Sequence, residues 1–168
     1  MLDCPSMVPH PRLATLLLAV LAAGLAAGAC GAPSAEDDAE DREAIQAFLE
    51  EYLPELAEAY RTGEVAALDP FAAAKEQEKV SRMVQELAKA GEVLAPELES
   101  VQVEDVTVWN EVNAYATTVE IWDVRTYALG TERVVREQLA QPNRVKYQLK
   151  RTGGRWRVFW REVERTYE

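Results

Sequence analysis

Aromatic side chains are the residues of this 168-residue chain best suited to bind a small molecule. An aromatic ring combines a large apolar area with a polar edge, so several rings together can line a pocket. The same rings also fill the interior of a folded domain, and we expect core packing to be their main role. The set comprises Trp109, Trp122, Trp156, Trp160, Tyr115 and Tyr147.

Few residues of the chain suit metal or nucleophilic chemistry. An acidic cluster consists of Asp37, Asp38, Glu40, Asp41 and Glu43. It lacks the spaced oxygen ligands and glycine turn of a calcium loop, so we interpret it as a solvated run. The sequence also lacks a phosphate-binding loop, a dinucleotide fingerprint and a serine-nucleophile motif. We therefore expect no metal, no cofactor and no enzymatic activity.

The first thirty residues have the order of an export signal. Arg12 precedes an apolar run over residues 13–29, which is too short and too rich in Ala and Gly to predict a membrane-spanning helix. The run ends in Leu25-Ala-Ala-Gly-Ala-Cys30-Gly, which resembles the lipobox of bacterial lipoproteins, although Ala27 stands where Leu is commonest. The resemblance implies that residues 1–29 are a signal peptide and that acylated Cys30 anchors the protein on the extracytoplasmic side of the cell membrane. A secreted protein cleaved nearby and an uncleaved N-terminal anchor are the alternatives.

Cleavage before Cys30 would leave 139 residues, enough for one domain. Residues 30–41 are small and acidic, so we expect a disordered, lipid-anchored linker there and a folded domain over residues 42–168. The only histidine, His10, and the other cysteine, Cys4, lie in the segment that would be removed. The net charge of −11 argues against nucleic acid as a partner.

Two helices are expected at the start of the domain. Large apolar residues recur every three or four positions from Ile45 to Tyr60, which predicts a helix that ends at Gly63 and is kinked at Pro54. Asp69-Pro70 has the residue types of a helix start, and the second helix is predicted from there to Gly91. Its buried side is expected to contain Val80, Met83, Val84 and Leu87, and its wet side Lys75, Glu76, Glu78, Lys79 and Glu86.

After Gly91 the apolar residues alternate with polar ones, which is the period of a β-strand. We predict strands over residues 99–109, 113–127, 131–139, 143–151 and 155–164, although residues 131–139 would also fit a helix. The apolar phase slips by one residue between Val103 and Val106, which predicts a β-bulge near Asp105.

The register of the last hairpin follows from its turn. A two-residue loop at Gly153-Gly154 aligns Leu149 with Val158 and Tyr147 with Trp160, which brings the apolar residues of both strands to one face.

The same register gives the outer face a basic strip, with Lys150 opposite Arg157 and Lys146 opposite Arg161. Like charges placed opposite one another destabilise a sheet. We therefore expect the strip to be a partner surface for an anionic envelope component. The alternatives are that long side chains spread into water, or that an acidic residue of a neighbouring strand neutralises the strip; the candidates are Glu120, Glu132 and Glu137.

Two helices followed by an antiparallel meander predict an α+β fold, with the helices packed on one face of a curved sheet. The order of elements and the ending Val145-Lys-Tyr-Gln-Leu-Lys-Arg-Thr-Gly-Gly-Arg-Trp-Arg-Val158 resemble the nuclear-transport-factor-2-like cone. Within that superfamily the chain resembles the intermembrane-space domain of a plastid-division J-domain-like protein, over about residues 42–165.

The resemblance implies a cavity at the open end of the cone, which some members use for binding and a few for isomerase chemistry with a carboxylate base and a tyrosine. Asp123 and Tyr115 lie eight residues apart on one strand, roughly 27 Å, so they cannot share a small substrate. Asp123 would have to pair with Tyr52, Tyr60 or Tyr147 instead, and we interpret it as a solvated strand-end carboxylate.

The expected function is that of a lipid-anchored envelope module without catalytic activity, which binds a protein or an anionic envelope component. The alternative is a small-molecule-binding or isomerase-like cone. An open cavity with aromatic walls and one buried carboxylate would favour this alternative, and a filled cone would favour the first function. The pocket candidates are Tyr52, Tyr60, Trp109, Trp122, Asp123, Tyr147 and Trp160.

Overall fold

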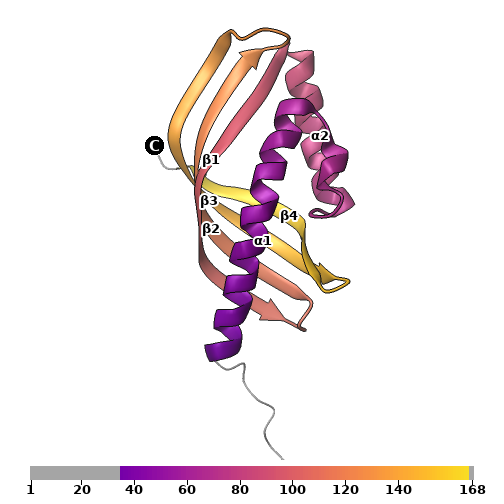
Figure 1. Ribbon diagram of the computed structural model, residues 1–168, viewed down its shortest axis with the longest axis vertical. Helices are drawn as coiled ribbons and strands as arrows, with labels where there is room; N and C mark the ends of the chain where they lie inside the picture. Colours follow the sequence, from indigo (N-terminus) through magenta and orange to yellow (C-terminus); the bar gives the residue numbers. More distant parts are fainter. Residues whose placement is uncertain (1–34, 167–168) are drawn as a thin grey trace, which may run out of the picture. The chain divides into compact units, whose positions relative to one another are not determined.

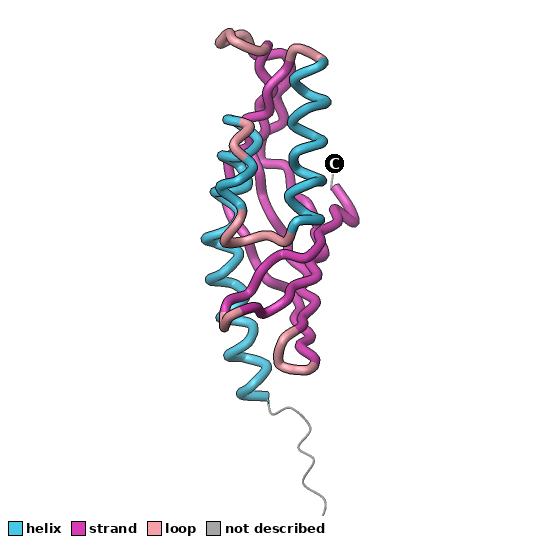
Figure 2. Tube along the Cα trace, turned by 90° about the vertical axis from the view of Figure 1, so that its right-hand side faces the viewer, coloured by secondary structure: helices cyan, strands magenta, loops and turns pink. Residues whose placement is uncertain are grey.

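A computed structural model describes residues 35–166 as two helices packed on one antiparallel sheet, which confirms the predicted α+β class (Figure 1). The chain forms α1 (Ala35–Thr62), a 3₁₀ turn η1 (Val65–Leu68) and α2 (Ala74–Lys89). It then forms β1 (Glu92–Trp109), β2 (Asn113–Ala128), β3 (Val134–Thr152) and β4 (Arg155–Thr166), and the strands are ordered β1-β2-β3-β4 in the sheet. In the tube view the helices are cyan and the strands are magenta (Figure 2).

Helix α1 forms one side of the hydrophobic core. Its apolar stripe is buried at Ile45, Leu49, Leu53 and Leu56, and the helix ends before Gly63, whose φ of 82° is the left-handed conformation that the sequence predicted. Pro54 lies inside the helix.

The predicted disordered spacer is wrong for residues 35–41, because α1 already begins at Ala35. Acidic residues suit the positive end of a helix dipole, so the composition that suggested a solvated linker also suits a first helical turn. Asp41 is tied to the sheet by an ion pair with Arg151 at 3.5 Å. The remainder of the expected linker and the expected signal peptide lie outside the described residues.

The second helix begins at Ala74, five residues after the predicted start at Asp69. Val158 of β4 donates its N–H to the carbonyl of Phe71 at 2.8 Å and accepts the N–H of Ala73 at 2.8 Å. These bonds hold the chain extended against the sheet and delay the start of α2. Asp69 is therefore the C-cap of the 3₁₀ turn and not the N-cap of α2. The end of α2 agrees with the prediction, since Gly91 has a φ of 71°.

The sheet differs from the prediction mainly in strand lengths. The two strands predicted over residues 131–139 and 143–151 are one strand, β3, which continues through Pro142. The expected bulge near Asp105 is confirmed by a register shift between Val103 and Asp105.

The final hairpin confirms half of its predicted register. Gly153 and Gly154 form the turn, and Leu149 lies opposite Val158 as expected. A bulge then places Phe159 as an extra residue, so that Trp160 lies opposite Gln148 and Arg161 lies opposite Tyr147. The predicted pairs of Tyr147 with Trp160 and of Lys146 with Arg161 are therefore wrong. A one-residue slip exchanges the two faces of a strand, and here it turns Arg161 toward the helices.

Within the part of the chain that the structure describes, neither helix is long and apolar enough to cross a membrane.

Candidate functional site

A pocket of about 210 Å³ lies between the two helices and the helix-facing side of the sheet, which we call the inner face. Its walls are mainly apolar, and they come from α1 and from all four strands. Met83 of α2 and Val163 of β4 also line it, and each is nearly half exposed, so they mark its rim. Four of the apolar wall residues are Leu56, Leu94, Val124 and Val145.

Arg161 is the only basic residue that lines this pocket. Its Nε donates to the buried Glu76 carboxylate at 2.6 Å, and its Nη2 donates to the Tyr60 hydroxyl at 2.8 Å. Burial lowers the pKa of the Arg161 guanidinium, but the oxygens of Tyr52, Tyr60 and Glu76 raise it by more, so the pKa lies well above its ordinary value. The β4 bulge at Phe159 brings this charge into the interior of the fold.

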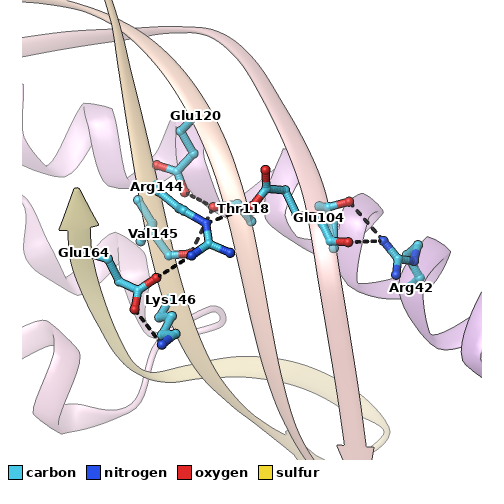
Figure 3. A network of polar contacts seen from close by, with 9 residues as sticks. Arg42, Glu104, Thr118, Glu120, Arg144, Val145, Lys146 and Glu164 are labelled. Carbon is cyan, nitrogen blue, oxygen red and sulfur yellow. Dashed lines mark hydrogen bonds and ion pairs between the residues drawn. The ribbon is translucent and has the colours of Figure 1, made fainter. Parts of the chain in front are cut away.

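Glu120 supplies a buried carboxylate to the pocket. One oxygen accepts hydrogen bonds from the hydroxyls of Thr118 at 2.9 Å and Tyr147 at 2.5 Å, and the other accepts the Trp122 indole N–H at 2.9 Å. Figure 3 shows Glu120 and Thr118 joined in this way. Thr118, Glu120 and Trp122 alternate along β2, so the period of the strand places all three on the inner face.

Two fully buried tyrosines lie behind the pocket. Burial, together with the nearby Glu120 carboxylate, raises the pKa of Tyr147 well above its ordinary value. Burial also raises the pKa of Tyr52, although Arg161 acts in the opposite direction. The Tyr52 hydroxyl interacts with the Arg161 guanidinium without a hydrogen bond of ordinary geometry, whereas that of Tyr147 is bonded to Glu120.

The structure brings only part of the predicted pocket set together. Tyr60 and Trp122 line the pocket, while Tyr52 and Tyr147 stand behind it as partners of Arg161 and Glu120. Trp109 packs against Tyr115 at the β1–β2 turn, with ring centroids 4.6 Å apart.

Trp160 lines a separate hollow of about 550 Å³ on the outer side of α2. The slip in the β4 register explains its place, because the slip moves Trp160 off the face that holds Tyr147.

Asp123 has a structural role. Its Oδ1 accepts the backbone N–H of Ala140 at 2.8 Å, and Ala140 has a φ of 50° at a bulge where β3 shifts its register against β2. The carboxylate also lies 3.9 Å from Arg125. Asp123 therefore supports an irregular backbone instead of facing a tyrosine.

Sequence reasoning missed the residues that give the pocket its charge. Glu76 was expected on the wet side of the second helix, but it is fully buried, because its partner Arg161 comes from a strand 85 positions further along. Glu120 was considered only as a neutraliser of the basic strip. Glu120 lies two residues before Trp122 on the same strand, so the period of the strand already indicated that both side chains face inward.

The predicted basic strip does not form a continuous surface. Lys146 pairs with Glu164 at 2.5 Å, Arg161 is turned inward, and Arg157 donates to the backbone carbonyls of Asp69 and Ala72. Lys150 remains exposed opposite Arg157. Figure 3 shows that the acidic partner of Lys146 is Glu164, which was not among the three expected candidates.

A larger groove of about 600 Å³ adjoins the pocket and shares Ala57 and Pro96 with it. Its charged residues include Glu58, Arg61 and Arg125, which form ion pairs near the surface. In residues 35–166 no group of three or more His, Cys, Asp or Glu side chains is placed to hold a metal ion.

Comparison with known proteins supports the fold and leaves the function open. No family model matches the sequence, and no curated protein matches it significantly. Among solved structures, the intermembrane-space region of the chloroplast protein ARC6 is similar with a TM-score of 0.62 and 14% identity, over 73% of this chain and 95% of that one. A protein from Catenulispora acidiphila matches with a TM-score of 0.49 and 13% identity, over 74% and 94% of the two chains.

A domain from Nostoc punctiforme that is described as having a cystatin-like fold matches with a TM-score of 0.37 and 16% identity, over 71% of this chain and 73% of that one. The α+β arrangement of two helices on a four-stranded antiparallel sheet is thus similar to that of the ARC6 region. At such low identities the likeness concerns the fold alone.

Proposed function

We propose that this domain binds a small molecule without transforming it, and that a lipid on Cys30 holds it on the extracytoplasmic side of the cell membrane. The observation that carries the proposal is the pocket of about 210 Å³, with apolar walls and with Arg161 and Glu120 among its lining residues. Binding sites combine mostly apolar walls with a few convergent polar groups in this way. The cavity favours the small-molecule alternative over a filled scaffold.

The hydrogen bonds of Glu120 argue for binding rather than isomerase chemistry. A general base must be free to accept a proton from its substrate. Both oxygens of Glu120 already accept protein donors, and all three donors, Thr118, Trp122 and Tyr147, are themselves buried. Asp123, the other carboxylate considered as a base, already accepts the backbone N–H of Ala140.

A direct test is saturable binding of a small aromatic probe, 1-acetylnaphthalene, to the purified full chain, followed by quenching of tryptophan fluorescence. Ala57→Leu adds volume at the pocket wall without touching a polar group, and it should weaken binding at least about tenfold by occlusion. Ala88→Leu adds the same volume on the exposed side of α2 and should leave binding unchanged. Absence of saturable binding, or equal binding by both variants, would overturn the proposal.

The tether is proposed from the sequence around Cys30, which lies outside the described residues. Cys30→Ala should move the protein from the membrane fraction to the soluble fraction, because lipid chains on this residue would provide stable attachment. Cys4→Ala is the matched control, since it removes the other thiol of the chain. Equal membrane retention of wild type and Cys30→Ala would contradict the anchor and leave the pocket proposal untouched.

A further inference from the structure

We infer that the ligand of this pocket is a neutral, mainly apolar molecule with one hydrogen-bond acceptor oxygen, such as a ketone, quinone or ester. This inference rests on the proposed binding function and names the chemistry of its ligand. Three features of the pocket carry it, namely its size, its balance of charge and the unused donors of Arg161.

The size of the pocket favours a compact ligand. The pocket measures about 210 Å³, which is below the roughly 300 Å³ at which pockets for drug-sized molecules begin. Its apolar walls from α1 and the sheet favour a compact ring or a short hydrocarbon over a peptide or a complete lipid.

The charge balance selects a neutral ligand. Arg161 and Glu120 are the charged residues that line the pocket, and Glu76 directly behind Arg161 already pairs with its guanidinium. A buried charge is costly unless it is paired. An anionic ligand would compete with Glu76 and face Glu120, whereas a cationic ligand would face Arg161. A neutral ligand avoids both penalties.

The acceptor requirement comes from the geometry of Arg161. A guanidinium carries five N–H donors and accepts nothing. Its Nε bonds to Glu76 and its Nη2 bonds to Tyr60, and the Tyr52 oxygen also interacts with the guanidinium. These three oxygens leave at least two of the five N–H donors for a ligand. Asn143, on the neighbouring strand β3, adds an amide to the same pocket. An acceptor oxygen on an apolar ligand can bond to this remaining donor edge.

Three probes with one ring system test the inference. Naphthalene offers no acceptor, 1-acetylnaphthalene offers a neutral carbonyl and 1-naphthoate offers a carboxylate. The ketone should bind the wild-type full chain at least about tenfold more tightly than naphthalene, because hydrogen bonds to charged groups are the stronger ones. The carboxylate should bind least tightly. Failure of all three to bind would defeat the proposed function itself.

Binding of 1-naphthoate as tightly as the ketone, or equal binding of ketone and hydrocarbon, would overturn the ligand class while the binding function stands. Arg161→Lys keeps the charge but loses the planar fork, so it should abolish the preference for the ketone over naphthalene, a ratio that is measured within this one variant. Arg133→Lys, on the exposed β2–β3 turn, is the matched control. If Arg161→Lys does not fold, the wild-type probe series decides the question on its own.

Discussion

The two faces of the sheet use the same kinds of charged residue in opposite surroundings. On the inner face, Arg161 and Glu76 form an ion pair in which the side chains are 11% and 0% exposed. On the outer face, Lys146 and Glu164 form a pair that is 52% and 25% exposed, and Arg144 also bonds to Glu164 (Figure 3). A buried ion pair stabilises the fold only if its attraction exceeds the free energy lost when both charges leave water. An exposed pair keeps most of its hydration, so it gains and loses little.

This difference indicates what each network is for. Replacing a buried ion pair by packed apolar residues is often neutral or stabilising, so stability alone is a weak reason to keep one. Arg161, the cation of the inner pair, lines the pocket of about 210 Å³ together with Glu120. The outer pairs lie on a solvated surface and need no such explanation.

The largest effect should come from breaking the inner pair on one side. Arg161→Met leaves the Glu76 carboxylate buried without its cation, and we expect a loss of about 3–5 kcal/mol in the free energy of unfolding. The double variant Glu76→Leu and Arg161→Met should recover much of that loss, because neither charge is then stranded. Urea denaturation of both variants measures this difference. If the double variant had the same free energy of unfolding as Arg161→Met, the loss would come from packing and not from the unpaired charge.

A smaller effect separates the two buried tyrosines. Tyr147→Phe removes a donor to the buried Glu120 carboxylate and should cost about 1.5–3 kcal/mol. Tyr52→Phe removes a hydroxyl that makes no hydrogen bond of ordinary geometry and only interacts with Arg161, so it should cost less than Tyr147→Phe at pH 7. The exposed Tyr115→Phe is the control for loss of a hydroxyl as such. Equal costs for Tyr52→Phe and Tyr147→Phe would contradict the assigned hydrogen bonds.

The same tyrosines should make the protein sensitive to alkali. Burial raises the pKa of Tyr52 and Tyr147 in the folded state, so above about pH 10 the unfolded state loses these protons first. Their contribution to stability is complete below pH 10 and should then fall by about 1.4 kcal/mol per pH unit for each group. The lowered pKa of Lys79, caused mainly by burial, acts in the opposite direction only below its ordinary pKa of 10.5, so the tyrosine slope stands alone above that pH.

Urea unfolding between pH 8 and pH 11 measures this slope, and absorbance at 295 nm follows tyrosine ionisation in the folded state. Tyr147→Phe should flatten the alkaline slope. An unchanged slope in Tyr147→Phe would show that this phenol titrates freely.

The fold was more predictable than the site, and two bulges show the reason. The bulge between Val103 and Asp105 was visible because the apolar phase slips there. The bulge at Phe159 was not, because aromatic residues occupy both possible phases of β4, so alternation continues through Trp160 either way. That hidden bulge decides whether Arg161 faces solvent or the pocket.

Glu76 illustrates a second limit of prediction. On helix periodicity alone it belongs with its charged neighbours on the wet side, and an acidic residue in a first helical turn needs no special partner. Its burial depends on Arg161, a residue from the last strand, and on the late start of α2. Such long-range pairing of charges leaves no local signal in the sequence.

The smallest effect should come from the outer face. Lys146→Gln removes an exposed ion pair with Glu164, and we expect a loss of about 0–1 kcal/mol at low salt that disappears in about 1 M NaCl. Lys150→Gln, on the same strand and also exposed, is the matched control for loss of a positive charge. Arg161→Met should keep its full cost at both salt concentrations, because salt screens buried charges far less than exposed ones. If Lys146→Gln cost as much as Arg161→Met and resisted salt equally, exposure would not be what separates the two networks. The inner pair would then stabilise the sheet in the same way as the outer pairs, and its burial would give no reason to assign it a role in ligand binding.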